Sequence, residues 1–114
     1  MIRTPGAIAL DSRPMRVDVY MRHGDTWSKA FTFNDETTLA GRSFACQIRT
    51  PTGTLIQTLT VTVAGIVVTA TLSAAQSALL TPGTDMIWDL QETTSGVITT
   101  RIAGKWNCEI QSTQ

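Results

Sequence analysis

Apolar and polar residues alternate along most of this chain, which is the period of a β-strand that buries one face. Such runs recur about every ten residues, a spacing typical of an antiparallel β-sandwich or barrel. The sets that we expect to share buried faces are Met15, Val17, Val19 and Met21; Trp27, Phe31 and Phe33; Phe44, Cys46 and Ile48; Leu55, Leu59, Val61 and Val63; Met86, Trp88 and Leu90; and Ile98, Thr100, Ile102, Trp106, Cys108 and Ile110.

Turn and cap residues divide these strands. Ala64-Gly65 predicts the turn of a β-hairpin over residues 55–72. Ser73 is a good N-cap, and Gln76 three residues later completes the capping-box pattern, so a short helix is expected over 73–80. Gly104, midway in the last strand, predicts a bulge or bend.

The fold class expected from this pattern is all-β, an antiparallel β-sandwich of about seven strands with one short helix. A chain of 114 residues fits one domain. Residues 1–14 contain Pro5 and Pro14 and show no periodicity, which favours an extended N-terminal arm. The sandwich domain is expected to span residues 15–112.

The net charge and the targeting signals limit the kinds of partner that we expect for this chain. The formal net charge is zero, whereas nucleic acids and anionic membranes attract strongly basic proteins, so neither is expected as a partner. No apolar run reaches the length of about 18 residues that would indicate a membrane span. Residues 1–6 lack the apolar core of a signal peptide, which favours synthesis in the cytoplasm and reduced cysteines.

Reactive residues are few. His23 is the only histidine and falls in a predicted turn, while Cys46 and Cys108 lack the close pairing of zinc ligands. Asp35 and Glu36 are adjacent, but a Ca²⁺ site needs six to eight oxygen ligands. We therefore predict no catalytic, cofactor-binding or metal-binding residues and no enzyme activity. Asp89 is expected to point away from the core and to make either a cross-strand polar contact or a turn-stabilising bond to backbone amides.

Trp27, Trp88 and Trp106 fall in phase with apolar neighbours, so we expect them in the core. A sugar-binding platform would need them exposed instead. Cys46 and Cys108 share the core phase and are expected to be two buried thiols. A disulfide between them is the alternative if their strands pair.

The order of these motifs resembles a small β-sandwich domain of tailed-bacteriophage virion proteins. Residues 24–27 (GDTW), 31–33 (FTF) and 39–41 (LAG) carry the first part of the resemblance, and 72–76 (LSAAQ), 88–91 (WDLQ), Gly96 and Gly104 carry the rest. The resemblance covers about residues 15–110 and rests on turns and core strands.

The resemblance implies a virion structural protein of the tail fibre, baseplate or another tail-associated part. Its partners would be other virion proteins, including copies of itself, and its location would be the virion, after assembly in the host bacterial cytoplasm. The alternatives are a head decoration or connector protein, and a carbohydrate-binding module that attaches to a host-surface glycan. We expect the arm and one sheet edge to contact neighbouring subunits, or else the loops at residues 34–39 and 81–85.

Overall fold

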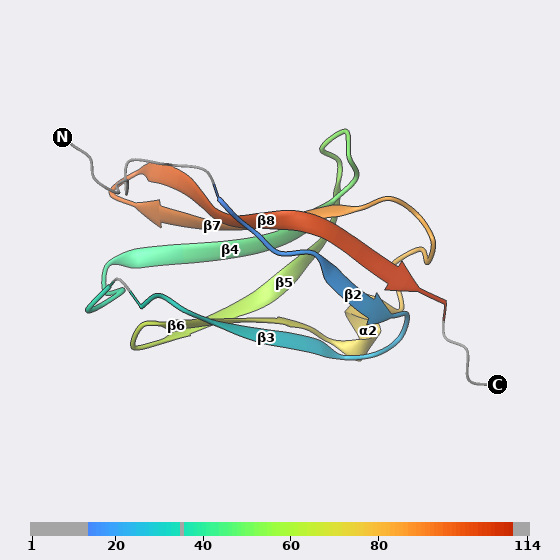
Figure 1. The fold of residues 1–114 in the computed structure, drawn as a ribbon, viewed down its shortest axis with the longest axis horizontal. Helices are drawn as coiled ribbons and strands as arrows, with labels where there is room; N and C mark the ends of the chain where they lie inside the picture. The colour runs from blue at the N-terminus through green and yellow to red at the C-terminus, as the bar shows by residue number, and fades with distance from the viewer. Residues whose placement is uncertain (1–13, 35, 111–114) are drawn as a thin grey trace.

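A computed structural model describes residues 14–34 and 36–110 of the chain. The described part is mostly β-structure with one short helix, as the sequence predicts (Figure 1). Its elements are, in chain order, β1 (Met15–Arg16), β2 (Val19–Arg22), β3 (Trp27–Thr32), β4 (Arg42–Arg49), β5 (Leu55–Ala64), β6 (Val67–Leu72), α2 (Ala74–Ser77), β7 (Ile87–Thr94) and β8 (Val97–Glu109).

The strands form one mixed sheet in the order β1-β8-β7-β4-β5-β6-β3, and β2 also pairs with β8. Because β1 and β2 both lie parallel to β8, they occupy the same edge position one after the other. All other neighbours are antiparallel. The prediction of an antiparallel fold is therefore wrong at this edge alone.

A single strand joins the two halves of the sheet. The first part of β5 pairs with β4 and its second part pairs with β6, so β5 crosses from one half to the other, as Figure 1 shows. The sheet curls around its core like half of a barrel. The β-sandwich prediction is met only in part, because the two layers are halves of one continuous sheet.

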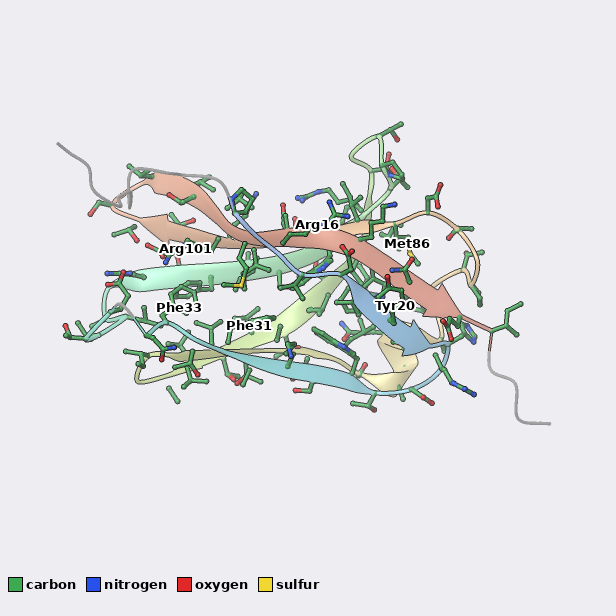
Figure 2. All side chains as sticks on the ribbon, in the orientation of Figure 1. Arg16, Tyr20, Phe31, Phe33, Met86 and Arg101 are labelled. Atoms are coloured by element: carbon green, nitrogen blue, oxygen red, sulfur yellow. The ribbon has the colours of Figure 1, made fainter. Side chains whose placement is uncertain are left out.

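The core lies between these two halves. Trp27 on β3 contacts Trp106 on β8, with ring centroids 4.8 Å apart and the rings edge to face. Phe31, also on β3, stacks at 6.0 Å on Trp88 of β7. Figure 2 shows Phe31 and Phe33 pointing into the space between the halves. Edge-to-face and offset rings at these distances attract each other beyond the burial of their area, so they hold the curl closed.

The predicted hairpin and helix are both present. β5 and β6 pair across a turn at Gly65, whose φ of 61° suits a residue without a β-carbon. Ser73 caps α2: its hydroxyl accepts from the Gln76 backbone N–H, and the Gln76 side chain accepts from the Ser73 N–H. The helix is shorter than predicted, because it ends at Ser77 and continues only as turns.

The strand predicted over residues 15–21 is broken at Val17 and Asp18. Gly104 of β8 lies opposite the break, and a β-carbon there would come within 1.9 Å of the Val17 carbonyl oxygen. The glycine is thus required by a close approach of two backbones. Trp88 pairs with Gly104 in regular register, so a bulge at Gly104 is wrong, and the alternative of a bend stays a prediction. Met15, predicted to be buried, is 64% exposed.

The bulge in β8 lies at Arg101. Leu90 pairs with Ile102 and Gln91 pairs with Thr100, so Arg101 is the extra residue. A bulge reverses the alternation of side chains on its strand, which explains why Ile98 is exposed although Ile102 is buried. The prediction that Ile98 shares the buried face of Trp106 is therefore wrong. Ile110 was predicted on the same face but is also exposed, because it lies beyond the end of β8.

Leu55 and Val63 near the two ends of β5 are also exposed against prediction, while Leu59 in its middle is buried. A strand that passes from one half of the sheet to the other covers the core only with its central part. Of the predicted arm only Pro14 is described, and residues 1–13 and 111–112 of the predicted segments lie outside the described residues. No helix in the described ranges is long and apolar enough to cross a membrane.

Candidate interaction surfaces

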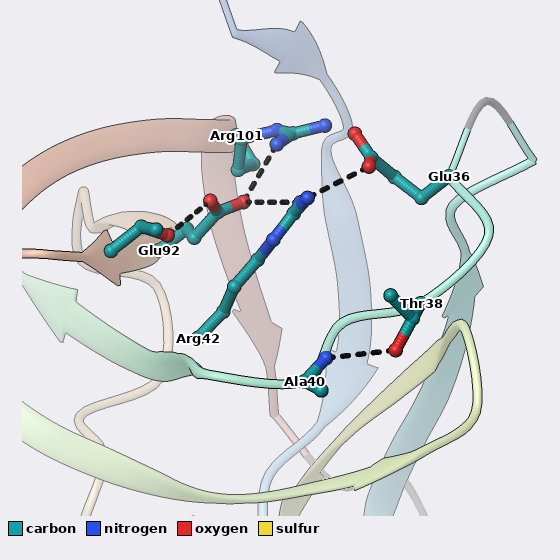
Figure 3. A network of polar contacts seen from close by, with 7 residues as sticks. Glu36, Thr38, Ala40, Arg42, Glu92 and Arg101 are labelled. Atoms are coloured by element: carbon teal, nitrogen blue, oxygen red, sulfur yellow. Dashed lines mark hydrogen bonds and ion pairs between the residues drawn. The ribbon is translucent and has the colours of Figure 1, made fainter.

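A network of charged side chains lies at the end of the curled sheet where β4 begins (Figure 3). Glu92 of β7 is only 7% exposed and accepts from Arg101 at 2.7 Å. Arg42 of β4 lies 3.7 Å from the same Glu92 oxygen and donates to Glu36 at 2.8 Å. The hydrogen bond from Arg42 is the main cause that lowers the pKa of Glu36.

This network has a structural explanation. The Arg101 guanidinium lies 4.7 Å from the centre of the Phe33 ring, a cation–π contact. The bulge turns Arg101 towards Glu92, whose other oxygen accepts from Thr94 at 2.7 Å. Charges that are paired and hydrogen-bonded in this way can close the end of an apolar core.

An open hollow of about 540 Å³ lies over β1, β8, β7 and β4. Ala103 and Gly104 line it, and their lack of bulk leaves room above the sheet. The other lining residues are Pro14, Arg16, Gln47, Arg49, Ile87, Trp88, Asp89 and Lys105.

The lining carries more positive than negative charge. Arg49 lies 3.5 Å from Asp89, which confirms the predicted cross-strand contact of Asp89, and it also donates to Gln47. Burial raises the pKa of Asp89, although the Arg49 charge acts in the opposite direction. Arg16 pairs with Asp18 at 3.3 Å on the rim.

Asp18 connects the two segments of the chain that form this rim, β1 and β8. Its Oδ1 accepts from the Lys105 backbone N–H at 2.9 Å, where the strand break leaves that donor unpaired by backbone. This hydrogen bond is the main cause that lowers the pKa of Asp18. The carboxylate is therefore fixed beside Arg16 and Lys105.

His23 lies in the turn after β2, as predicted, but it is partly buried and bonded. Its Nε2 donates to the Ala78 carbonyl at 3.0 Å, and the adjacent Gly24 N–H donates to the buried Ser77 hydroxyl at 2.8 Å. These contacts dock the turn onto α2, which gives His23 a structural role.

The remaining residues that the sequence offered as candidates for a functional site lie in the core or outside the described residues. Trp88 and Trp106 are 2% and 1% exposed, which confirms them as core residues, and Trp27 packs against them. Cys46 and Cys108 are buried free thiols, so the disulfide alternative is wrong. Asp35 is not among the described residues.

Among residues 14–34 and 36–110, no three His, Cys, Asp or Glu side chains are grouped as metal ligands. Folding without a metal remains a prediction for the whole chain. Thermal melts of the protein with and without a chelator test it: we expect the two curves to coincide, and a lower melting temperature with chelator would contradict it.

The edges of the sheet carry features that limit pairing with another strand. β1 has two residues and follows Pro14, and β8 is distorted by the bulge at Arg101. Lys29 lies exposed in the middle of β3, the opposite edge. Short strands, proline, bulges and lysine all weaken strand addition, so the exposed side chains on the faces are stronger candidates for contacts than the backbone edges.

The residues that build the hollow were not singled out from the sequence. Arg16, Arg49 and Lys105 each lie on the outward phase of a predicted strand, and this phase was the available signal. It could not show that the three cations meet, because β1 pairs with the distant strand β8 in parallel. A search of known families and of curated proteins finds no match to this chain.

Proposed function

We propose that this chain is a structural subunit of a tailed-bacteriophage virion, in a tail fibre, baseplate or other tail-associated part, and acts through protein–protein contacts. The resemblance of its motif order to virion β-sandwich domains motivates the proposal. The proposal includes the finer fold class: the halves β1/β2-β8-β7-β4 and β5-β6-β3 act as the two layers of a β-sandwich joined through β5.

The observation that supports contact with other proteins is the composition of the outer surface. Large apolar side chains remain exposed at several positions, among them Tyr20 at 69%, Leu79 at 75% and Ile87 at 39%. Exposed apolar groups next to charged ones are typical of surfaces that a partner covers. A head decoration or connector protein would use such a surface equally well.

The carbohydrate-binding alternative finds less support. Stacking on a sugar needs an exposed aromatic face, and the three tryptophans contact one another inside the core instead. Tyr20 is the one aromatic side chain that is largely exposed in the described part of the chain.

The proposal is tested by particle composition. A host culture carrying the phage is lysed, the particles are banded in a density gradient, and the chain is quantified in the band by mass spectrometry. We expect it in a constant ratio to the other virion proteins after a salt wash. A chain that stays in the soluble lysate, while particles form normally when its gene is deleted, would overturn the proposal.

A further inference from the structure

One stretch of the sheet edge is left uncovered by the described residues. β8 pairs with β7 along Val97–Lys105, and on its other side it pairs with β1 and β2 only from Ile102 onwards. Residues 97–100 (VITT) therefore have no strand on that side within the described part of the chain. We call these residues the open edge of β8.

The turn before β8 decides which backbone groups the open edge offers. Ser95 and Gly96, the central residues of this turn, have φ of 50° and 81°, and two positive values are typical of a type I′ turn. The residue that follows such a turn, Val97, exchanges hydrogen bonds with its partner on β7, and pairs along an antiparallel ladder alternate in this respect. The N–H and C=O groups of Ile98 and Thr100 therefore point away from β7.

The side chains of the open edge favour pairing with another strand. All of them are β-branched, which suits a strand, and Val97 and Ile98 are each 64% exposed. Residues 97–100 contain no proline, lysine or bulge, the features that weaken strand addition elsewhere on this sheet. An uncovered apolar edge of this kind readily pairs with an extended segment that reaches it.

The N-terminal part of the chain leads directly to the open edge. In both β1 and β2, each residue pairs in parallel with the residue 87 positions later, so the register is kept across the break between these strands. Figure 1 shows β2 following β8 in this way. Followed backwards from Met15, the same register leads to the open edge and assigns residues 10–13 to it. It also places Pro14 opposite the bulge residue Arg101, a position at which a residue without an N–H is tolerated.

We propose that residues 10–13 of the same chain occupy the open edge, as a parallel strand that continues β1 beyond Pro14. The length is sufficient, because 13 residues extend over as much as about 43 Å and the open edge spans only about 13 Å. The register pairs Leu10 with the exposed Val97 and Ser12 with Thr99, two similar pairs on one face of the strand.

Tethering favours this occupant over a segment of another molecule. Residues 10–13 are joined to β1 through Pro14, which itself is described beside the sheet. A segment that is held so close to its site has an effective concentration on the order of millimolar, which a second copy reaches only in concentrated solution. The open edge is therefore expected to be filled within one chain.

This inference goes beyond the proposed function and does not rest on it. The segment would form the outermost strand of the sheet, so contacts of the arm with a neighbouring subunit would start from this edge. Residues 97–100 are not members of the core cluster. We therefore expect the segment to protect the edge while adding little to the stability of the core.

An engineered disulfide tests which residues lie at the open edge. Ser12→Cys combined with Thr99→Cys places two thiols on neighbouring strands about 4.8 Å apart, which a disulfide can bridge. We expect a bond between positions 12 and 99 within one chain after mild oxidation in dilute solution, identified by peptide mapping. Ser12→Cys combined with Thr93→Cys is the matched control. Thr93 lies one strand further from the edge, on β7 opposite Ile98, and should form the bond much more slowly.

Amide hydrogen exchange of the natural chain, followed by NMR, gives a second reading that needs no substitution. We expect the N–H groups of Ile98 and Thr100 to be protected in the full chain. Deletion of residues 1–13 should raise their exchange rates by about tenfold or more, since unpaired edge amides open at little cost in free energy. Asn107 is the control in both chains, because its partner strand β2 is retained, and its exchange rate should stay the same.

Three results would overturn the inference. Exchange rates of Ile98 and Thr100 that the deletion leaves unchanged would show that residues 1–13 do not cover the edge. Equal rates of bond formation at positions 93 and 99 would show that position 12 is not held in the proposed strand. Bonds between two chains in dilute solution would assign the open edge to the arm of a second copy.

Discussion

At the scale of single residues, Trp88 connects three parts of the structure. Its ring stacks on Phe31 at 6.0 Å and lies 5.9 Å from Trp106, so it touches both halves of the sheet. Its Nε1 donates to the Val17 carbonyl at 2.8 Å, at the break between β1 and β2. One side chain thus holds the curl closed and satisfies a backbone oxygen that the broken strand leaves open.

Replacing Trp88 should therefore be costly. We expect Trp88→Ala to lower the free energy of unfolding by about 3–5 kcal/mol, the range for a buried tryptophan that leaves a cavity. Urea unfolding followed by circular dichroism measures it. Tyr20→Ala is the control on an exposed aromatic and should change stability by less than about 0.5 kcal/mol. A cost below about 1 kcal/mol for Trp88→Ala would contradict its role in the core.

The buried thiol of Cys46 leads us to predict how the stability of the protein depends on pH. Burial, and to a smaller extent the Asp89 charge, raises the pKa of its thiol from 9.0 to about 12. Between these values the unfolded thiol loses its proton while the native thiol keeps it. The stability that Cys46 contributes is therefore complete below pH 9 and is lost as the pH rises towards 12.

Comparison with Cys46→Ala isolates this effect from other groups that titrate at high pH. We expect the unfolding free energy of the natural chain to fall more steeply above pH 9, by at most about 1.4 kcal/mol per pH unit. Urea unfolding at several pH values measures both slopes. Parallel slopes would mean that the thiol is as accessible in the folded protein as in the unfolded one.

At the scale of elements, β8 depends on two irregularities for its contacts with the rest of the chain. The bulge turns Arg101 towards Glu92 and Phe33. Gly104 lets the Val17 backbone come close enough for β1 and β2 to follow the same strand. Without either one, thirteen residues of regular strand could not pair with β7 on one side and with two separate short strands on the other.

The contact between Glu92 and Arg101 makes the bulge testable. Glu92→Gln removes the charge that pairs with Arg101 and Arg42, and we expect a loss of about 2–3 kcal/mol in unfolding free energy. The value lies below that of a fully buried pair because both arginines are about a quarter exposed. Glu109→Gln, at an exposed carboxylate, is the control for urea unfolding. If Glu92→Gln and Glu109→Gln lower the unfolding free energy by the same small amount, the network contributes little to stability.

The sequence predicted most elements because alternation and capping are local signals. The faces of Phe44–Ile48 and Met86–Leu90, the hairpin at Gly65 and the capping box of Ser73 are all confirmed. Ile98 and Gly104 were misread because their environment depends on strands that are distant along the chain. The proximity of Tyr20 and Lys105 could not be predicted for the same reason, because they are neighbours only through the parallel pairing of β2 with β8.

At the scale of the whole molecule, the described residues form one buried core. Its first and last members are Val19 and Cys108. β2 and β8 hold the two ends of this stretch side by side, since Met21 pairs with Cys108. This pairing ties the two ends of the described core together, and we predict that residues 1–13 add little to its stability.

A chain that lacks residues 1–13 tests this separation of stability from assembly. We expect its melting temperature to stay close to that of the full chain, because the deletion removes no member of the described core. Its incorporation into particles should be weaker, since the predicted role of the arm is contact with a neighbouring subunit. Calorimetry measures the first outcome and the composition of gradient-banded particles the second. A deletion that unfolds the protein would show that the arm is an integral strand, and unchanged incorporation would shift the contacts to the faces and loops of residues 14–110.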